Sequence, residues 1–337
     1  MRGLKEVPAV VKNRLFPVVR LRPWLTASSF DRAIEVTREA VGDGTFGFDL
    51  DDTKFDPNSD RAAVKLFTKL FSPVNGYQEY YEFLVDKPDL VPVFRDLTSD
   101  NTQGLSQIYQ ASLLDRGLFV RVDLSNPGSF LDIARLCVRS EMKNVVFIFD
   151  CGWRRDPLPF AAICVGFVKS LLEISDEFEI VITSSSFPAD FTDQGNRFSV
   201  RISERDFYNL VRSQINIGKI FYGDWGSTRS PRLESQVMRS RPRIDLARHD
   251  SWMFWRSDGV ENYQMLAKRA VMDHLWQPSP SSWGKYLINC TALGVEPCIR
   301  SAVMAAAARI NTHLIEQCSI ESSIDPDQGD ELLGDDF

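Results

Sequence analysis

The sequence predicts an α/β fold, a closed (β/α)8 barrel of the TIM type. Short apolar runs alternate with segments of helical periodicity, which is typical of parallel βαβ units. Several runs are β-branched or aromatic throughout, as in strands buried on both faces. Eight such runs within roughly 220 residues match the strand number and size of a barrel. They are residues 15–21, 45–50, 90–94, 118–124, 144–149, 178–183, 198–202 and 219–222.

The segments between these runs have the apolar periodicity of covering helices. The helices are expected at residues 28–41, 58–71, 78–85, 106–114, 129–142, 157–174 and 204–213. The alternative is an open, doubly wound sheet. No glycine-rich dinucleotide fingerprint follows the first run, and this favours the barrel.

The pattern changes beyond the eighth run. Residues 243–257 resemble a two-stranded insertion that turns at His249-Asp250, and helices are expected at 259–274, 281–289 and 298–315. We expect these elements to complete the last helical layer and to cap the barrel. The predicted organisation is therefore a barrel domain at 1–318, in which 224–318 form the final layer and lid, and a disordered acidic tail at 319–337.

The net charge of the chain comes from this tail. The chain has 39 Lys and Arg residues against 46 Asp and Glu residues, a formal net charge of −7. Residues 321–337 contain seven acids and no base, so the preceding 320 residues are electrically neutral. A neutral body argues against a general polyanion-binding protein.

Composition also limits the compartment and the metal chemistry. The six cysteines form no CxxC pair, and three histidines offer no zinc-ligand spacing. We therefore expect a soluble, cytoplasmic protein without a zinc site. The most apolar run, residues 158–168, is shorter than the ~20 residues that cross a bilayer, so no membrane partner is expected.

Four segments in the second half resemble a known family by their order and spacing. They are Ser186-Phe187-Pro188, Gly223-Asp224-Trp225-Gly226, the strand at 250–256, and Ser282-Trp283-Gly284-Lys285-Tyr286. They are similar to the beta protein family, which occurs in tailed phages and in bacterial genomes, often in mobile or defence-like neighbourhoods. The resemblance extends forward to Asp49, Arg121 and Asp150 on the predicted strands. It implies a role in phage–host conflict and supplies no catalytic residues.

Charged residues gather where the predicted strands end, which is the functional face of a barrel. In the run FVRVDL, Arg121 and Asp123 share one face because successive side chains of a strand alternate. The candidate catalytic residues are Asp49, Asp123, Asp150 and Asp224, and the candidate ligand-binding residues are Arg20, Arg121, Arg201, Trp225 and Lys285.

Two interpretations of these charged residues at the mouth of the predicted barrel, where the strands end, remain open. The arginines can clamp an anion while Asp49, Asp123 and Asp150 hold Mg²⁺ or Mn²⁺, an arrangement that supports phosphodiester hydrolysis. Alternatively, Arg–Asp pairs close the barrel without catalysis, and no cofactor is required. Nucleophilic templates are incomplete: Ser184–Ser186 lack a GxSxG motif, Cys151 has no evident histidine, and the histidines fall in elements expected at the surface.

An arginine-rich stretch offers a surface for a partner. Six arginines and two acids lie between Arg229 and Arg248. The candidate partner-binding residues are Arg229, Arg232, Arg239, Arg241 and Arg243. With Trp225, Trp252 and Trp255 nearby, this stretch can bind an acidic protein surface or single-stranded nucleic acid.

The function predicted from sequence is therefore a phage-associated barrel protein that binds a partner in phage–host conflict. A protein partner is favoured, and a nucleic acid is possible. A metal-dependent phosphodiesterase or nuclease acting at the mouth is the alternative. The oligomeric state is open.

Overall fold

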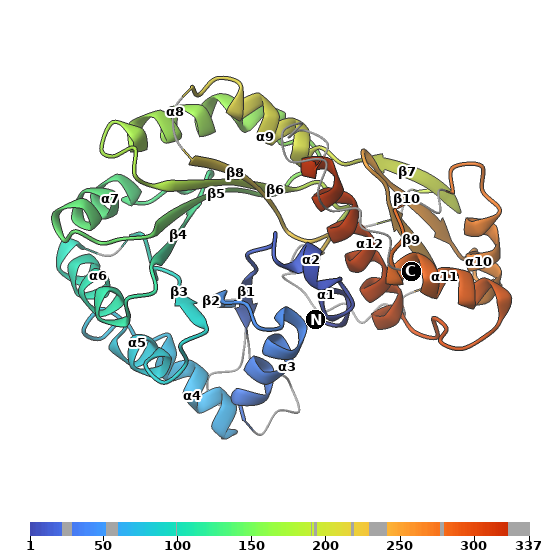
Figure 1. The fold of residues 1–337 in the computed structure, drawn as a ribbon, viewed down its shortest axis with the longest axis horizontal. Helices are drawn as coiled ribbons and strands as arrows, with labels where there is room; N and C mark the ends of the chain where they lie inside the picture. Colours follow the sequence, from blue (N-terminus) through green and yellow to red (C-terminus); the bar gives the residue numbers. More distant parts are fainter. Residues whose placement is uncertain are drawn as a thin grey trace.

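A computed structural model of the chain describes residues 1–21, 29–51, 60–98, 100–189, 191, 194–216, 219–228, 241–276 and 280–322. Its parallel strands lie on the inner side of a curved layer of helices (Figure 1). The arginine-rich residues 229–240 and the tail beyond residue 322 fall outside the described residues.

The parallel strands form two sheets. The first has the order β1-β2-β3 and the second the order β4-β5-β6-β8. A parallel bridge from Val93 to Phe119 joins β3 to β4. The bounds are β1 Val18–Leu21, β2 Phe46–Leu50, β3 Leu90–Pro92, β4 Leu118–Asp123, β5 Val145–Trp153, β6 Glu179–Ser185 and β8 Lys219–Asp224. The runs predicted at these places are confirmed as strands.

Helices cover the outer face of these sheets, as the helical periodicity predicts. They are α3 Asp31–Val41, α4 Ala62–Leu70, α5 Gln78–Leu84, α6 Asn101–Leu114, α7 Phe130–Arg139, α8 Ala161–Leu172 and α9 Glu204–Arg212. α6 begins five residues before its predicted start because Asp100 caps it, its carboxylate accepting the Gln103 N–H at 2.9 Å.

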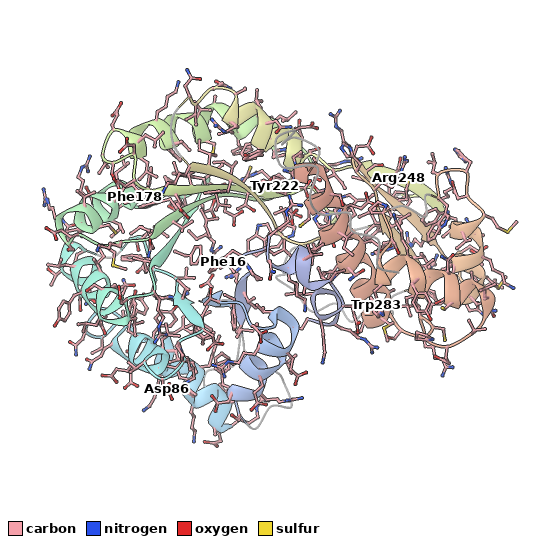
Figure 2. The ribbon with its side chains drawn as sticks, in the orientation of Figure 1. Phe16, Asp86, Phe178, Tyr222, Arg248 and Trp283 are labelled. Carbon is pink, nitrogen blue, oxygen red and sulfur yellow. The ribbon has the colours of Figure 1, made fainter. Side chains whose placement is uncertain are left out.

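Alternation along the strands separates two apolar cores. On β4, Leu118, Val120 and Val122 pack outward with the helices in the main core. Phe119 faces inward, into a smaller cluster with Val91, Val93 and Ile148, against which Val18, Val146 and Val181 pack. Figure 2 shows Phe16 on the inner side of the strands, with its ring centroid 5.1 Å from that of Phe119. The inner face of the strands is therefore apolar around Phe119. Polar side chains of the inner face lie at the carboxyl ends of the strands.

The seventh predicted barrel strand belongs to a different sheet. β7 (Arg197–Arg201) pairs antiparallel with β10 (Ser251–Arg256), which pairs with β9 (Arg243–Ala247). Residues 197, 199 and 201 are exposed and residues 198 and 200 half-buried, whereas β2 and β3 are buried at every position. This alternation is typical of an antiparallel strand with one solvated face, and it explains the wrong assignment of residues 198–202.

The C-terminal helices pack against this antiparallel sheet. They are α10 Tyr263–Val271, α11 Trp283–Leu293 and α12 Ala302–Ser322. The short N-terminal helices α1 (Arg2–Lys5) and α2 (Ala9–Lys12) lie near α12, and the tight contact of Gly3 with α12 leaves no space for a Cβ. α12 passes the predicted boundary of the tail at residue 319 and reaches Ser322.

The C-terminal elements lie beside the parallel strands, with α12 between the two parts (Figure 1). The sequence predicted that residues 224–318 form the final layer and lid of a barrel, and that organisation stays a prediction. The hairpin at 243–257 and its turn at His249-Asp250 are confirmed. No helix within the described ranges is long and apolar enough to cross a membrane.

Candidate functional site

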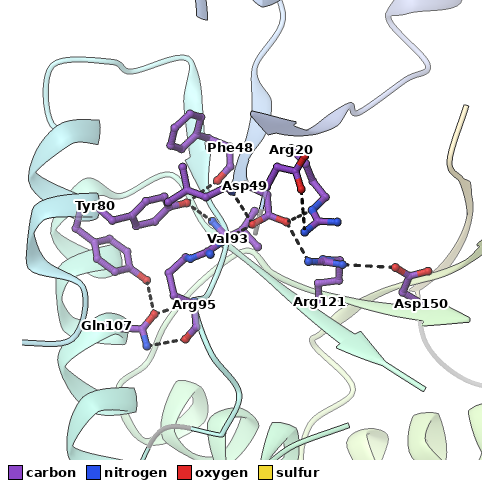
Figure 3. A network of polar contacts seen from close by, with 12 residues as sticks. Arg20, Phe48, Asp49, Tyr80, Val93, Arg95, Gln107, Arg121 and Asp150 are labelled. Carbon is purple, nitrogen blue, oxygen red and sulfur yellow. Dashed lines mark hydrogen bonds and ion pairs between the residues drawn. The ribbon is translucent and has the colours of Figure 1, made fainter. Parts of the chain in front are cut away.

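Three guanidinium groups surround one buried carboxylate at the carboxyl end of β2. The side chain of Asp49 is 1% exposed. Its Oδ2 lies 3.3 Å from Arg20 Nε and 3.2 Å from Arg121 Nη2, and Arg95 Nη1 donates to its Oδ1 (Figure 3). A buried carboxylate of this kind is stable only because it is paired on several sides.

The strands themselves place these groups. Arg20 on β1 is in register with Asp49 on β2. Arg121 faces inward because its neighbours Val120 and Val122 belong to the outer core. The sequence prediction that these side chains meet at the ends of the strands is consistent with this geometry.

Arg95 is held by residues that the sequence reasoning missed. The side-chain oxygen of Gln107 accepts the backbone N–H of Arg95 at 2.8 Å, and its side-chain nitrogen donates to the backbone carbonyl of Arg95 at 2.9 Å. The Tyr80 hydroxyl donates to the Phe48 carbonyl and accepts the Val93 N–H at 2.9 Å (Figure 3). Gln107 is a fully buried amide in an otherwise apolar helical face, which is the signal that could have identified it.

Asp150 forms the second half of the network. Arg121 Nη1 lies 3.7 Å from Asp150 Oδ2, and the Trp225 indole N–H donates to Asp150 Oδ1 at 3.0 Å. Burial raises the pKa of Asp150, and hydrogen bonds from Trp225 and the charge of Arg121 oppose that rise. Arg121 therefore lies between two carboxylates, and its side chain keeps 29% exposure.

Trp225 also stacks on a second tryptophan. The centroids of Trp153 and Trp225 are 4.2 Å apart, with 35° between the ring planes. Trp153 lies on β5, which continues beyond its predicted end at residue 149 through Gly152 at φ 67°. The sequence reasoning missed Trp153 because it ended the strand too early.

Asp123 does not join the other two carboxylates. Its exposed side chain accepts the Ser125 N–H at 2.7 Å and caps the following turn. Both oxygens of Asp49 are occupied by arginines. Among the described residues no group of three or more His, Cys, Asp or Glu side chains has the arrangement of a metal site. The donor set Asp49, Asp123 and Asp150 therefore does not fit a Mg²⁺ or Mn²⁺ ion in this conformation.

Asp224 pairs with a histidine that was predicted at the surface. His313 on α12 is fully buried, its Nε2 lies 2.9 Å from Asp224 Oδ2, and it stacks on Trp252 at 4.6 Å. Tyr222 donates to the same carboxylate oxygen at 2.8 Å. Burial alone would raise the pKa of Asp224, but the charge and hydrogen bond of His313 lower it to about 2. Asp224 thus joins β8 to α12.

Three predicted binding residues lie outside the parallel sheets, and each forms an ion pair there. Lys285 Nζ on α11 lies 2.8 Å from Glu316 on α12, and both are buried. Arg201 on β7 lies 2.7 Å from Asp206. Arg243, predicted to bind a partner, pairs with buried Asp245 on its own strand. Each of these three charges therefore has an ion-pair partner within the fold, and their roles in binding stay predictions.

Of the other predicted partner-binding residues, the structure describes only Arg241. Arg229, Arg232 and Arg239 lie outside the described residues, and Arg241 is exposed at their border. Trp252 and Trp255, expected beside this stretch, are buried in apolar clusters. They therefore offer no stacking surface.

The structure also places two candidate nucleophiles, Ser186 and Cys151. Ser186 Oγ donates to buried Glu204, and both groups lie in the interior. Burial raises the pKa of the Cys151 thiol to about 12. A thiol of that pKa is not ionised near neutrality and is a poor nucleophile.

Comparison with known proteins identifies the relatives of the chain. A sequence model described as "Beta protein" matches residues 1–319. The chain is 26% identical over 337 residues to a protein named "Protein beta" from Enterobacteria phage P4, covering 96% of this chain and 91% of that protein. No solved structure matches. The family match spans almost the whole chain and agrees with the segments recognised in the sequence, so the chain belongs to the Beta protein family.

Proposed function

We propose that this chain is a binding protein in phage–host conflict that recognises an anionic, phosphate-bearing group at the carboxyl ends of its parallel strands. The observation that carries this proposal is the arginine trio around Asp49. The phage context rests on the similarity to the phage P4 protein. All six cysteines are free thiols, which supports a cytoplasmic site of action.

Arg121 is the group that binds the anion in this proposal. Arg20 and Arg95 have side chains only 15% and 11% exposed, whereas that of Arg121 is 29% exposed. Its 3.7 Å separation from Asp150 is long for a charge-assisted hydrogen bond. Arg121 can therefore take an anion on its accessible side without abandoning Asp49.

The Trp153–Trp225 pair is the second part of the proposed site. Trp225 and Arg121 approach the same carboxylate, Asp150, from different sides. Both indoles are half-buried, so each retains accessible surface. A phosphate-bearing ligand with a planar group would contact a cation and an aromatic face together.

Hydrolysis with Mg²⁺ or Mn²⁺ is less well supported. It requires carboxylates that converge with oxygens available to the ion. Asp49 is occupied by three arginines and Asp123 is turned to the surface. Binding without chemistry needs no such rearrangement.

Isothermal titration with phosphate, pyrophosphate and a nucleoside triphosphate tests the proposal. We expect saturable binding by the wild type and a loss of at least about tenfold in the Arg121→Gln variant, because a charge-assisted hydrogen bond contributes roughly 1.5–3 kcal/mol. The control is Arg135→Gln, which removes an exposed arginine paired with Asp132 on α7. Equal affinities in the two variants would exclude Arg121 as the anion-binding group.

A second arm of the same experiment addresses catalysis. Phosphodiester substrates are incubated with Mg²⁺ or Mn²⁺ and wild-type or Asp150→Ala protein. Product formation that depends on Asp150 would replace the binding proposal by the hydrolase. Absence of product with intact anion binding is the expected result.

We also propose that the parallel strands form one barrel-like ring. The Val93–Phe119 bridge and the shared inner cluster of β3, β4 and β5 support it. Within the described ranges no pairing joins β8 to β1, and β7 lies in the other sheet, so such a ring has seven strands. A crystal structure tests this arrangement.

A further inference from the structure

The outward face of α6 carries no charge and has an apolar ridge along it. The fourteen residues from Asn101 to Leu114 contain no Asp, Glu, Lys or Arg. Leu105, Tyr109 and Leu113, spaced four residues apart, are 48%, 62% and 68% exposed. A surface helix normally presents charged and polar residues to water, and loss of charge with retention of aromatic side chains marks interface surfaces. This apolar ridge therefore indicates a contact site.

The ridge is flanked by two grooves. A groove of about 560 Å³ lies between α5 and α6 and is lined by residues including Glu82, Ser106, Tyr109 and Arg116, and the guanidinium of Arg116 donates to backbone carbonyls at the end of α5. A second groove of about 450 Å³ lies on the other side, toward Ser140, and shares Ser106 and Tyr109. Ridges formed by every fourth residue of one helix pack into grooves of another. This surface thus contains both halves of a helix–helix contact.

The neighbouring helices carry opposite charge. α5 has exposed Glu79 and Glu82 and no basic residue. α7 carries Arg135 and Arg139 with one acid, Asp132, which pairs with Arg135 at 2.7 Å. The neutral α6 therefore lies between an acidic edge and a basic edge, in the order α5, α6, α7 along the curved layer of helices (Figure 1).

We propose that α6 is the interface of a two-fold dimer in which the ridge of each copy enters a groove of the other. A two-fold axis close to the direction of α6 places the acidic edge of one copy opposite the basic edge of its partner. The perpendicular axis would place acid against acid. A neutral centre lets two identical surfaces meet without like-charge repulsion, so a second copy suits this face better than a charged partner.

Sedimentation velocity over a concentration series tests the dimer. We expect a monomer–dimer equilibrium for the wild type and for Val303→Glu, a control at another exposed apolar position, 81% exposed. Tyr109→Glu should weaken the dimer at least about 30-fold, the size expected for an interface hot spot. Circular dichroism and anion titration should be unchanged in Tyr109→Glu, which separates this proposal from the anion site.

Charge reversal tests the orientation of the two copies. Glu82→Arg and Arg139→Glu should each weaken the dimer, and the double variant should restore it. A wild type that is monomeric throughout, or that dimerises equally well as Tyr109→Glu, would overturn the dimer. A Tyr109-dependent dimer that the double variant fails to restore would overturn the two-fold axis proposed here.

Discussion

The carboxyl ends of the parallel strands and the contacts of α12 both gather buried charges, but they hold them differently. Around α12, Asp245–Arg309, Lys285–Glu316 and Asp224–His313 approach within 2.8–2.9 Å, and each side chain is at most 10% exposed. At the strand ends Arg121 is 29% exposed and contacts its two carboxylates at 3.2 and 3.7 Å.

Under the proposed function, this difference separates charges that stabilise the fold from charges that bind a ligand. Removing one partner of a buried ion pair lowers stability strongly because the remaining charge stays buried and unpaired. Arg121 is partly exposed. Without it, Asp49 keeps its two other arginines, and Asp150 keeps the hydrogen bonds from Trp225 and Gly152. The loss of Arg121 therefore has a smaller effect on folding. Arg121 can also reach a ligand.

The largest effect is expected at Asp245. Asp245→Ala leaves Arg309 and Arg243 without their carboxylate in the interior, so we expect a loss of about 3–5 kcal/mol in the free energy of unfolding. Urea unfolding measures it. Asp132→Ala, which breaks an exposed pair on α7, is the control and should cost less than about 1 kcal/mol. Similar losses in both variants would show that burial does not distinguish these pairs.

The Asp224→Asn substitution is expected to lower the free energy of unfolding by about 2 kcal/mol. It should also change how steeply stability falls at acidic pH. The pKa of Asp224 is lowered to about 2 from an ordinary 3.8, and each unit corresponds to about 1.4 kcal/mol. Because the folded-state pKa is depressed, this stability is fully present above pH 3.8 and is lost as the pH falls toward 2. Urea midpoints between pH 5 and 2 should therefore fall less steeply in the Asn variant. An unchanged slope would contradict the His313 pairing.

Arg121→Gln is expected to affect binding more than folding. We expect it to change the free energy of unfolding by about 1 kcal/mol or less while anion affinity falls at least about tenfold. Parallel urea unfolding and calorimetric titration give both values. A large loss of stability with unchanged affinity would show that Arg121 stabilises the fold, as the buried ion pairs around α12 do, and does not bind the anion.

The smallest effect is expected at Asp150. Its pKa is raised by burial, so protonation as the pH falls removes a negative charge that competes for Arg121. Affinity for sulfate, an anion whose own charge does not change over this range, should therefore rise a few-fold as the pH falls. Asp150→Asn should bind more tightly at neutral pH and lose this dependence. An affinity that rises with pH in the wild type would contradict the sign of this coupling.

Sequence reasoning succeeded where a local pattern determines the structure. The alternation in the run 118–124 placed Arg121 on the inner face, and the apolar runs located the parallel strands. The same rule, applied to β7, would have separated it from the barrel, because its alternation of charged and apolar residues is that of an antiparallel strand.

Sequence reasoning failed where a contact joins distant parts of the chain. His313 meets Asp224 across 89 positions, and nothing in an Ala-rich helix indicates that one histidine turns inward. Lys285 similarly matched a family segment but pairs with Glu316 on the next helix. Such pairings depend on how helices pack, which local periodicity does not determine.

Fluorescence titration of the wild type with pyrophosphate tests the central claim most directly, since Trp153 and Trp225 lie beside the proposed site. We expect a saturable change in tryptophan emission that is lost in Arg121→Gln and reduced in Trp225→Phe. The Arg135→Gln control should respond as the wild type does. A response that persists unchanged in Arg121→Gln, or no response while calorimetry also detects no binding, would contradict an anion site at the ends of these strands.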